Sequence, residues 1–402
     1  MRGVTNPVCT RCNQVGLTQS DSLECICPNR CGAILTSIYP HIHFQPDTSK
    51  HGLARYQAWL PPSKKKLPPI GSITYKSLAL GKYFGLDHLY ISFNGYWPEK
   101  NAWMESMTFK ELEAWAVCAT YRPSHGRLSL ASAGNAARSF LWVGYQQQIP
   151  LDIYIPDYAE KTLLPWFPTP DWIRLYVVPN KSYNEVIHLQ KEAIRNSHEK
   201  ITAIGGYRNT ARRDAIGTLF YNACEVIGQT PDHYFQAVGS GAGAIAIREA
   251  NQRITLDGSF GQKDTCLHLS QSGLCSVMVD AWIQGTRTLV SKKSDTYSQS
   301  AKTMLAKVLG NLEPGYGISG GVFDKLKETR GYLYSVDESK APQWQKFFEE
   351  KEGCDIGLPS AIAIDSLNQA VSLGRLGKSD IVLLNISEGG HEKLKGEKKV
   401  SS

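Results

Sequence analysis

The run YFQAVGSGAGAI, residues 234–245, joins a strand pattern to a helix pattern through a glycine-rich loop. Residues 234–238 are typical of a buried strand, and residues 244–251 are typical of a helix. Glycines at 239, 241 and 243 allow the backbone to approach a ligand closely. The helix start adds free N–H groups and the positive end of a helix dipole, so the loop predicts a phosphate site.

Two other interpretations of this loop remain open on these residues alone. Gly239, Gly241 and Ala244 also satisfy the GxGxxA form of a dinucleotide-binding fingerprint, with Asp257 close to the position of its ribose-binding acid. Glycine turns also join strands to helices without binding any ligand. Other segments must therefore decide between a phosphate group, a dinucleotide and a plain turn.

Strand-like and helix-like segments alternate on both sides of the loop. Strands are predicted at residues 88–93, 152–155, 173–178, 200–204 and 380–386. Ser182 and Glu185 form a capping box that opens a helix with an apolar stripe. Repeated βα units predict parallel sheets with helices on both faces, and such sheets bind ligands beyond the carboxyl ends of their strands.

Two further segments carry groups that suit such a ligand site. The turn Ser132-Ala133-Gly134-Asn135 lies between a short strand and a predicted helix, so its amides can bind a carboxylate. Lys110, in MTFKELEAWA, lies near the start of another predicted helix. Each is ordinary by itself, because such turns are common and most lysines point into water. They become informative only if the folded chain brings them to the glycine loop.

Composition describes an ordinary globular chain. It has 402 residues, 20% charged and 42% apolar, a length that suggests two or three domains. Lysine and arginine number 44 and aspartate and glutamate 37, which gives a net charge of +7. Basic residues are dense only at residues 64–66 and in the lysines of the tail, Lys393, Lys395, Lys398 and Lys399. This balance is too weak to indicate nucleic-acid binding, and it suits small anionic substrates.

Membrane and export signals are missing from the pattern. No run approaches the roughly 20 apolar residues that cross a bilayer, and residues 1–6 lack the apolar core of a signal peptide. We therefore expect no membrane partner and a cytoplasmic location.

Cysteines are concentrated at the N-terminus, where five of ten fall within the first 31 residues. Cys9 and Cys12 form a CxxC pair, and Cys27 and Cys31 can complete the four thiolates of a zinc ribbon, with Cys25 as an extra thiol. The second pair is irregular, because three residues rather than two separate its cysteines. A ribbon that packs without metal is the alternative.

Longer strings carry a more specific resemblance. These are GLARYQAWLP (52–61), YISFNGYWPEK (90–100), TFKELEA (108–114), ASAGNAAR (131–138), GGYRNTARRDAIGT (205–218), PDHYFQAVGSGAGAI (231–245), LHLSQS (267–272), GGVFDKLKET (320–329) and IVLLNISEGG (381–390). Together they resemble the cysteate synthase branch of the fold-type II pyridoxal-phosphate enzymes, in the threonine synthase group. The resemblance implies an α/β fold like that of the tryptophan synthase β subunit, with two three-layer α/β/α lobes behind a zinc-ribbon-like segment.

The same resemblance implies how the chain is divided. It places the cysteine-rich ribbon at residues 1–37 and a catalytic unit of two interleaved lobes at residues 38–392. The smaller lobe is expected at roughly 95–210, and a basic tail at 393–402.

Each loop also gains a role from the resemblance. Lys110 matches the lysine that forms the Schiff base with pyridoxal 5′-phosphate and then moves the substrate Cα proton. Asn135 matches the residue that faces the ring hydroxyl of the cofactor, and Ser387 the residue at its pyridine nitrogen. The cofactor phosphate is expected on Gly239, Ser240, Gly241, Ala242 and Gly243, and the substrate carboxylate on Ser132, Ala133, Gly134 and Asn135.

The implied reaction is β-replacement. O-phospho-L-serine loses its Cα proton and then phosphate to leave an aminoacrylate, and sulfite adds at Cβ to give L-cysteate, a precursor of coenzyme M or another sulfonate. Because leaving group and nucleophile are anions, Arg208, Arg212 and Arg213 are candidate substrate ligands, with surface or interlobe ion pairs as the alternative. His125 is a candidate for the same cleft, or is simply packed. A homo-oligomer is expected, as is common among relatives.

Two positions depart from the pattern of the family. Ala242 stands where the loop usually reads GSGTG, which removes a hydroxyl. The string NISEGG replaces NITGGG, so Ser387 keeps a hydroxyl but Glu388 adds a carboxylate beside the cofactor or the substrate entrance. That charge disfavours a dianionic nucleophile unless an arginine pairs with it.

Several alternatives to cysteate synthesis therefore stay open. Within the family they are a threonine synthase that acts on phosphohomoserine, and an enzyme that combines phosphoserine with another nucleophile. Outside it they are a nicotinamide-dependent oxidoreductase built on the dinucleotide fingerprint, and a non-enzymatic binding protein that uses a zinc ribbon.

Overall fold

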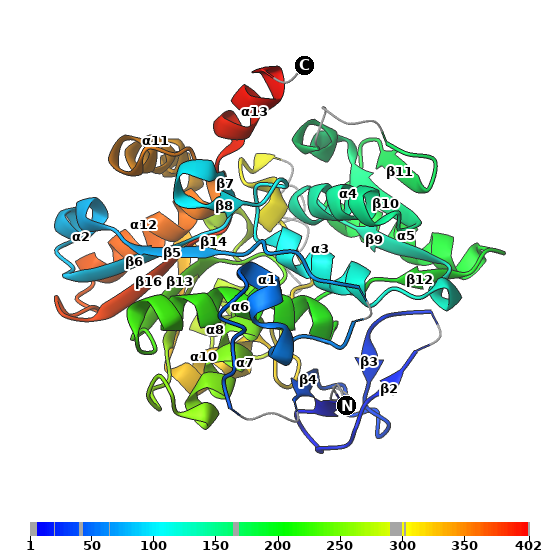
Figure 1. Cartoon of the computed structure of the whole chain (residues 1–402), viewed down its shortest axis with the longest axis horizontal. Helices are drawn as coiled ribbons and strands as arrows, with labels where there is room; N and C mark the ends of the chain where they lie inside the picture. The colour runs from blue at the N-terminus through cyan, green and yellow to red at the C-terminus, as the bar shows by residue number, and fades with distance from the viewer. Residues whose placement is uncertain are drawn as a thin grey trace.

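The computed structural model describes residues 6–19, 21–39, 43–63, 65–163, 169–289, 300 and 303–400. Figure 1 shows two α/β lobes side by side, with a small ribbon that contains the N-terminus below them. Lys64, residues 1–5 and 20 of the predicted ribbon, and residues 401–402 of the predicted tail lie outside the described residues.

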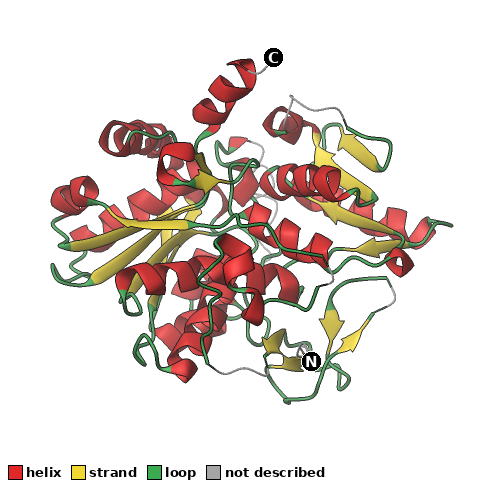
Figure 2. Ribbon diagram, viewed as in Figure 1, coloured by secondary structure: helices red, strands yellow, loops and turns green. Residues whose placement is uncertain are grey.

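The larger lobe contains a six-stranded sheet in the order β15-β14-β13-β16-β6-β5. β5 is antiparallel to β6, and the other neighbours are parallel. The strands are β5 (Ile73–Lys76), β6 (His88–Phe93), β13 (His233–Ala237), β14 (Cys266–Ser272), β15 (Tyr332–Val336) and β16 (Ile381–Ile386). Helices lie on both sides of the sheet (Figure 2): α1 (Gly52–Arg55), α2 (Leu78–Phe84), α6 (Thr210–Ile227), α7 (Ala242–Asp257), α8 (Val277–Ile283), α10 (Val322–Thr329), α11 (Ala341–Glu352) and α12 (Leu358–Ser372).

The smaller lobe contains a four-stranded, fully parallel sheet in the order β11-β10-β9-β12. Its strands are β9 (Arg127–Ala131), β10 (Leu151–Pro156), β11 (Ile173–Val178) and β12 (Ile201–Ala203), and its helices are α4 (Asn135–Gln147) and α5 (Tyr183–Asn196). The predicted capping box opens α5, since Ser182 Oγ accepts a bond from the Glu185 amide at 3.3 Å and the Glu185 carboxylate accepts one from the Ser182 amide at 2.8 Å.

The strand predictions agree closely with the structure. Residues 88–93 and 173–178 are strands with the predicted bounds, whereas the strand before the glycine loop begins and ends one residue earlier than predicted. The alternation of strands and helices therefore predicted the parallel βα architecture correctly, because most of the predicted strands are largely apolar runs bounded by turn residues.

Helix α3 (Lys110–Ala119) lies between the two lobes and packs against α4 and α6. Every residue of this helix after Lys110 is buried. A helix that is covered on all sides belongs to the core rather than to one amphipathic surface. Its first residue, Lys110, is therefore fixed at the junction of the lobes.

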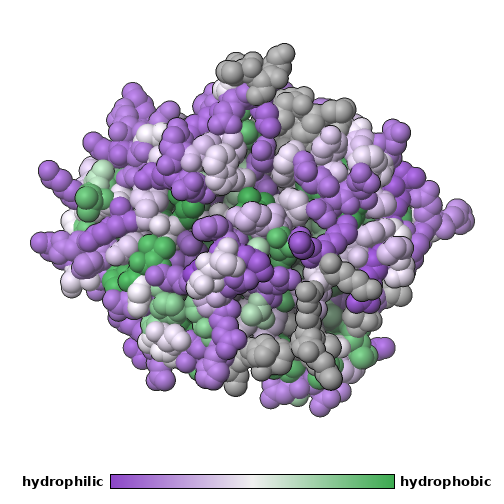
Figure 3. All heavy atoms as spheres, viewed as in Figure 1, coloured by the Kyte–Doolittle hydropathy of each residue, from purple (hydrophilic) through white to green (hydrophobic). Residues whose placement is uncertain are grey.

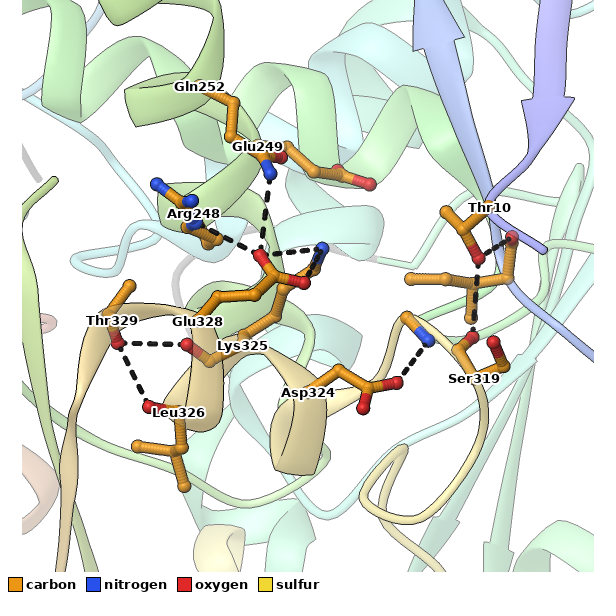
Figure 4. A network of polar contacts seen from close by, with 12 residues as sticks. Thr10, Arg248, Glu249, Gln252, Ser319, Asp324, Lys325, Leu326, Glu328 and Thr329 are labelled. Carbon is orange, nitrogen blue, oxygen red and sulfur yellow. Dashed lines mark hydrogen bonds and ion pairs between the residues drawn. The ribbon is translucent and has the colours of Figure 1, made fainter. Parts of the chain in front are cut away.

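The ribbon consists of two small antiparallel strand pairs, in which β1 (Asn6–Cys9) pairs with β4 (Leu35–Ile38) and β2 (Leu17–Thr18) with β3 (Cys25–Ile26). It docks on the loop before α10, where the Ile34 amide donates to the Ser319 carbonyl at 3.0 Å. Figure 4 shows Thr10 reaching the same carbonyl, with an Oγ1 to oxygen distance of 3.5 Å. The Gly320 amide then binds Asp324 Oδ2 at 2.8 Å, which anchors that loop to α10.

The ribbon also extends the smaller sheet. The Leu23 amide donates to the Ala203 carbonyl at 2.8 Å, and the Ala203 amide donates to the Asp21 carbonyl at 2.7 Å. These bonds lie along β12, which is an edge strand of that sheet.

Residues 393–400 of the predicted basic tail belong to a helix. α13 (His391–Val400) lies against a small hairpin of β7 (Tyr96–Trp97) and β8 (Ala102–Trp103). Lys393 pairs with Glu99 at 2.7 Å, and Lys398 pairs with Glu105 at 3.2 Å. These acidic partners explain why the segment is ordered despite its charge.

The face of the molecule in Figure 3 is mainly hydrophilic, with hydrophobic atoms in small, separate groups. Among the described helices, none is both long and apolar enough to span a bilayer.

Candidate active site

A cavity with about 730 Å³ of empty space, open to solvent, lies beyond the carboxyl ends of β9, β13 and β16. This is the position at which parallel α/β sheets bind ligands. The cavity brings together twelve of the residues predicted from the sequence: Lys110, Ser132, Ala133, Gly134, Asn135, Arg212, Gly239, Ser240, Gly241, Ala242, Gly243 and Ser387.

The glycine loop forms one wall and leads directly into α7. Gly241 is the residue before the helix and has φ +83°, a left-handed conformation that glycine adopts without strain. The Ala242 amide donates weakly to Ser240 Oγ at 3.4 Å, and the following amides of the helix start have no side-chain cap and remain as donors. A Cβ on Gly239 would lie 3.2 Å from the Val308 carbonyl, a tight contact that a glycine avoids. The loop therefore presents backbone N–H groups to an anion, and Ala242 does not remove them.

The turn before α4 forms the facing wall. Gly134 has φ 145°, and the Ser132 hydroxyl accepts bonds from the Gly134 amide at 3.2 Å and the Ala137 amide at 3.0 Å. Ser132 therefore braces the turn with its side chain. The amides of the turn are available at the cavity, whereas the Asn135 side-chain amide donates to Glu388.

Lys110 contributes an ammonium group to the cavity. Its Nζ lies 3.2 Å from Oε2 of Glu113, one turn along the same helix. Arg212, from α6, donates to Oε1 of the same carboxylate. All three side chains lie on elements that meet at the lobe junction, so the cavity wall carries two cations that share one buried carboxylate behind it.

Burial and the charges of neighbouring side chains act in opposite directions on the pKa values of Lys110 and Glu113. Burial lowers the pKa of Lys110, and the nearby Glu113 only partly offsets that effect. Burial alone would raise the pKa of Glu113, but the Arg212 guanidinium and the Lys110 ammonium hold it below its usual value. The carboxylate is therefore ionised, and Lys110 loses its proton more readily than an exposed lysine.

Arg212 is suited to an anionic ligand. Besides Glu113, it binds the Gly205 carbonyl, yet its Nε has no hydrogen-bond partner among the described residues. Only 9% of this residue is exposed, and it lines the cavity. A buried donor without a partner is costly, so a ligand oxygen would satisfy it.

Glu388 occupies the position that departs from the family pattern. Its Oε2 accepts a bond from the Asn135 side-chain amide and lies 3.8 Å from Nη2 of Arg138. Burial raises the pKa of Glu388, whereas Arg138 acts against that rise. A Cβ on Gly357 would lie 1.8 Å from Glu388 Oε1, so glycine at 357 leaves the space for this side chain. The arginine that the sequence reasoning required beside Glu388 is therefore Arg138.

Ser387 is buried at the end of β16. Its carbonyl accepts bonds from the Thr108 hydroxyl at 3.1 Å and the Phe109 amide at 3.0 Å. These bonds tie the end of the strand to the start of α3, which places Ser387 and Lys110 in the same wall.

The structure does not bring Arg208 or Arg213 to the cavity. The guanidinium of Arg213 is fully buried, pairs with Glu249 at 2.9 Å and donates to the carbonyls of Leu35 and Tyr207. For Arg213 the ion-pair alternative therefore holds, because this side chain connects α6 to Glu249 on α7 and to Leu35 in the ribbon. Arg208 lies over its neighbour Tyr207, with 5.7 Å from Cζ to the ring centroid.

His125 and Asp257 are also placed away from the cavity. Nδ1 of His125 accepts a bond from the Arg122 amide at 3.1 Å, before the start of β9 and thus at the opposite end of that strand from Ser132. Asp257 is the last residue of α7, whose 16 residues span roughly 24 Å, and it binds the amides of Phe44 and Ser259. The dinucleotide interpretation is therefore wrong, because its ribose-binding acid lies at the far end of the helix.

Several residues of the site were missed by the sequence reasoning. Gln236, Asn311 and Tyr183 line the cavity, while Glu113 and Arg138 hold residues that do so. Gln236 could have been noticed in the sequence, because it is a polar residue within an otherwise apolar predicted strand. The same is true of Arg138, because it falls inside a largely apolar helix.

The ribbon cysteines form a second cluster, one that could bind a metal ion. The Sγ atoms of Cys9, Cys12, Cys27 and Cys31 all lie within 4.8 Å of one another, whereas Cys25 is not part of the group. In tetrahedral zinc with bonds of about 2.3 Å, sulfur atoms are separated by roughly 3.8 Å. The four thiols therefore have a spacing that fits a structural zinc ion.

The cavity fits pyridoxal phosphate. It offers an anion cradle of backbone amides at the start of α7, an amine of lowered pKa on Lys110, and a hydroxyl on Ser387. The unpartnered Nε of Arg212 adds a place for a second anion.

Comparisons with known proteins agree with this fit. Residues 103–388 match the family model for "Pyridoxal-phosphate dependent enzyme". Cysteate synthase from Methanosarcina acetivorans is 40% identical over 348 residues, which cover 86% of this chain and 83% of that relative. Cysteate synthase from Methanosphaerula palustris is 37% identical over 388 residues, which cover 96% and 90%.

Solved structures show the same fold at low identity. Diaminopropionate ammonia lyase from Escherichia coli, in complex with an aminoacrylate-PLP azomethine intermediate, has a TM-score of 0.60 and 16% identity, covering 83% of this chain and 87% of that one. The processed form of threonine deaminase isoform 2 from Solanum lycopersicum has a TM-score of 0.56 and 13% identity, covering 82% and 87%.

Proposed function

Because this chain belongs to the pyridoxal-phosphate dependent enzymes and, within them, to the cysteate synthase family, we propose that it makes L-cysteate from O-phospho-L-serine and sulfite and releases phosphate. It has the fold-type II architecture of that superfamily. The observation that carries the proposal is the convergence of Lys110, Asn135, the glycine loop, Ser387 and Arg212 on one cavity.

Three groups of the cofactor have a candidate partner in the cavity. The amides of residues 239–243 would bind its phosphate, Lys110 would form its covalent attachment, and Ser387 would face its ring nitrogen with a hydroxyl. When bound, pyridoxal phosphate withdraws electrons from the substrate Cα, which makes the Cα proton acidic and allows the β-substituent to leave. A hydroxyl keeps the ring nitrogen largely unprotonated, which favours β-chemistry over transamination.

Lys110 is the residue that would move the Cα proton. Its Nζ is inside the cavity, and burial lowers its pKa. At neutral pH a larger fraction of this amine is therefore unprotonated, and able to accept the Cα proton, than in an exposed lysine. Glu113 holds the ammonium form at 3.2 Å and thereby fixes its position between proton transfers.

Arg212 is the residue that would hold the substrate anions. Its Nε is free of partners among the described residues, while its other nitrogens are fixed by Glu113 and the Gly205 carbonyl. A guanidinium held in this way presents a directed donor to the phosphate ester or to sulfite. Glu388 does not cancel this attraction, because Arg138 lies beside it.

The decisive experiment offers cofactor-loaded protein phosphoserine or phosphohomoserine, each with and without sulfite, and measures phosphate and amino-acid products. We expect cysteate from phosphoserine only when sulfite is present. Phosphate release without sulfite-dependent cysteate would overturn the choice of nucleophile, and threonine formed from phosphohomoserine would favour the threonine synthase alternative.

A variant pair tests the cofactor assignment separately. Lys110→Ala is expected to lose both turnover and the visible absorbance of lysine-bound pyridoxal phosphate. Lys346→Ala, which changes an exposed lysine on α11, is expected to keep both. Unchanged visible absorbance in Lys110→Ala would contradict the assignment.

Three further points are proposals of the same kind. We propose the division into a ribbon at 1–37, interleaved lobes at 38–392 and a C-terminal segment, and a homo-oligomeric state to be measured by light scattering. We also propose a cytoplasmic location, which the ten free cysteines support because a reducing compartment keeps thiols unpaired.

A further inference from the structure

A cluster of two histidines and a cysteine lies at the amino ends of β13 and β14, the sheet edge opposite the cavity. Nδ1 of His233 lies 3.0 Å from Nε2 of His268, and Sγ of Cys266 lies 3.5 Å from the same Nε2. The three donor atoms are all within 4.8 Å of one another. None of these residues has a part in the reaction proposed above.

The outer ring nitrogens of both histidines have partners of their own. Nε2 of His233 lies 3.1 Å from Oδ2 of Asp380, and Nδ1 of His268 lies 2.7 Å from the Tyr334 hydroxyl. Metal-binding histidines usually hold their second nitrogen in this way, on a carboxylate or another oxygen, which fixes the ring and its tautomer. The arrangement leaves the two inner nitrogens directed at each other and at the thiol.

The spacing of the donors matches a zinc-class ion. Zinc bonds of about 2.0–2.1 Å to nitrogen and 2.3 Å to sulfur, in tetrahedral geometry, separate nitrogen from sulfur by roughly 3.5 Å and two nitrogens by roughly 3.3 Å. The nitrogen–sulfur distance of 3.5 Å agrees with this, and the nitrogen–nitrogen distance of 3.0 Å needs only a small opening.

The protonation of the cluster is also compatible with a cation. Burial, followed by the charges of His233 and Arg375, lowers the pKa of His268 well below its usual value, so this ring is neutral. Burial raises the pKa of Cys266 to about 11, so the thiol keeps its proton until a metal displaces it. Solvent reaches the cluster, since the side chains of His233 and Asp380 are 15% and 33% exposed.

We propose that His233, Cys266 and His268 bind a divalent zinc-class ion, with water as the fourth ligand. The ion would join β13 to β14 directly, and its supporting groups Tyr334 and Asp380 extend the connection to β15 and the start of β16. Its role is structural, because the cavity lies at the other ends of these strands.

The zinc content of the protein and its variants tests whether this site binds metal, independently of the ribbon. The cofactor-loaded protein is stripped with chelator under reducing conditions, dialysed against zinc, washed, and analysed for metal per chain. Cys266→Ser and His233→Gln are expected to hold one zinc ion fewer than the unaltered protein. Because each variant is compared with the unaltered protein, the expected loss of one zinc ion is the same whether or not the ribbon contains zinc.

His88→Gln is the matched control, because His88 opens β6 in the same sheet but is not part of the cluster. It should bind as much zinc as the unaltered protein, and retained cofactor absorbance in every variant confirms folding. Cobalt in place of zinc should show a sulfur charge-transfer component that is lost in Cys266→Ser. Equal zinc content in all four proteins would overturn the proposal, as would a cobalt spectrum unchanged by Cys266→Ser.

Discussion

Nζ of Lys110 lies 3.2 Å from Oε2 of Glu113, a carboxylate that the guanidinium of Arg212 also contacts. The carboxylate is fully buried, so its charge is balanced by these two cations rather than by water. Removing one partner therefore changes the protonation and position of the other. The arrangement couples the lysine proposed to attach the cofactor to the arginine proposed to hold substrate anions.

Arg212→Gln is expected to raise KM for phosphoserine by roughly 10- to 100-fold, because a charge-assisted hydrogen bond contributes about 1.5–3 kcal/mol. Steady-state kinetics with cofactor-saturated protein would measure it. Arg208→Gln is the matched control, since Arg208 lies on the same segment but outside the cavity. Equal KM values for the two variants would remove Arg212 from the substrate site.

Glu388→Gln is expected to lower KM for sulfite several-fold, because it removes a carboxylate from beside Asn135 and leaves Arg138 with an unbalanced positive charge. Burial raises the pKa of Glu388, so the wild-type carboxyl is more fully ionised as pH increases. The difference between variant and wild type should therefore widen at higher pH. A ratio of KM values that stays at one throughout would contradict this account.

Glu111→Gln is expected to change how stability depends on pH. Burial raises the pKa of Glu111 to about 7, although its carboxylate binds the Ser106 amide at 2.7 Å and Trp115 Nε1 at 3.2 Å. The folded chain therefore holds a proton that the unfolded chain releases above its ordinary pKa. This stabilisation is present at low pH and falls by about 3 kcal/mol as pH rises from about 4.5 to about 7.

The glutamine variant cannot ionise at this position, so its unfolding free energy should lack that decline. Denaturant unfolding at pH 5, 6, 7 and 8 would measure both curves. Parallel curves would show that Glu111 does not titrate in this interval.

Cys27→Ser is expected to lose one zinc ion per chain and to lower the melting temperature if the ribbon holds zinc, because a structural zinc site contributes folding free energy directly. Cys25→Ser is the control, since Cys25 lies in the same segment but outside the group of four thiols. Metal analysis of protein purified without chelator would decide it. Equal zinc content in the two variants would leave the metal-free ribbon as the correct description.

Local patterns were enough to predict the parallel architecture, whereas the roles of Lys110, Asn135 and Ser387 came from the family resemblance. The glycine loop, the Asn135 turn and Lys110 each lie where a strand or loop passes into a helix. Turn chemistry is visible in short strings, because glycine is needed where φ is positive or where backbones approach closely. The sheet topology then brings those junctions to one edge.

The arginines show what local patterns cannot predict. Arg212 and Arg213 are adjacent on α6, so their side chains point roughly 100° apart around the helix axis. One lines the cavity, and the other is buried against α7 and the ribbon. Which of the two faces the cavity depends on where the lobes and the ribbon pack. The contact of Arg138 with Glu388 is likewise set by tertiary packing, since these residues come from different lobes.

The bonds from Asp21 and Leu23 to Ala203 have a consequence for solubility. β12 ends the smaller sheet on one side, and an uncovered edge strand offers free backbone groups to any other extended chain. The ribbon occupies those groups on β12. Loss of the ribbon would therefore expose a template for intermolecular strand pairing, and a truncated chain should aggregate even if its catalytic lobes remain folded.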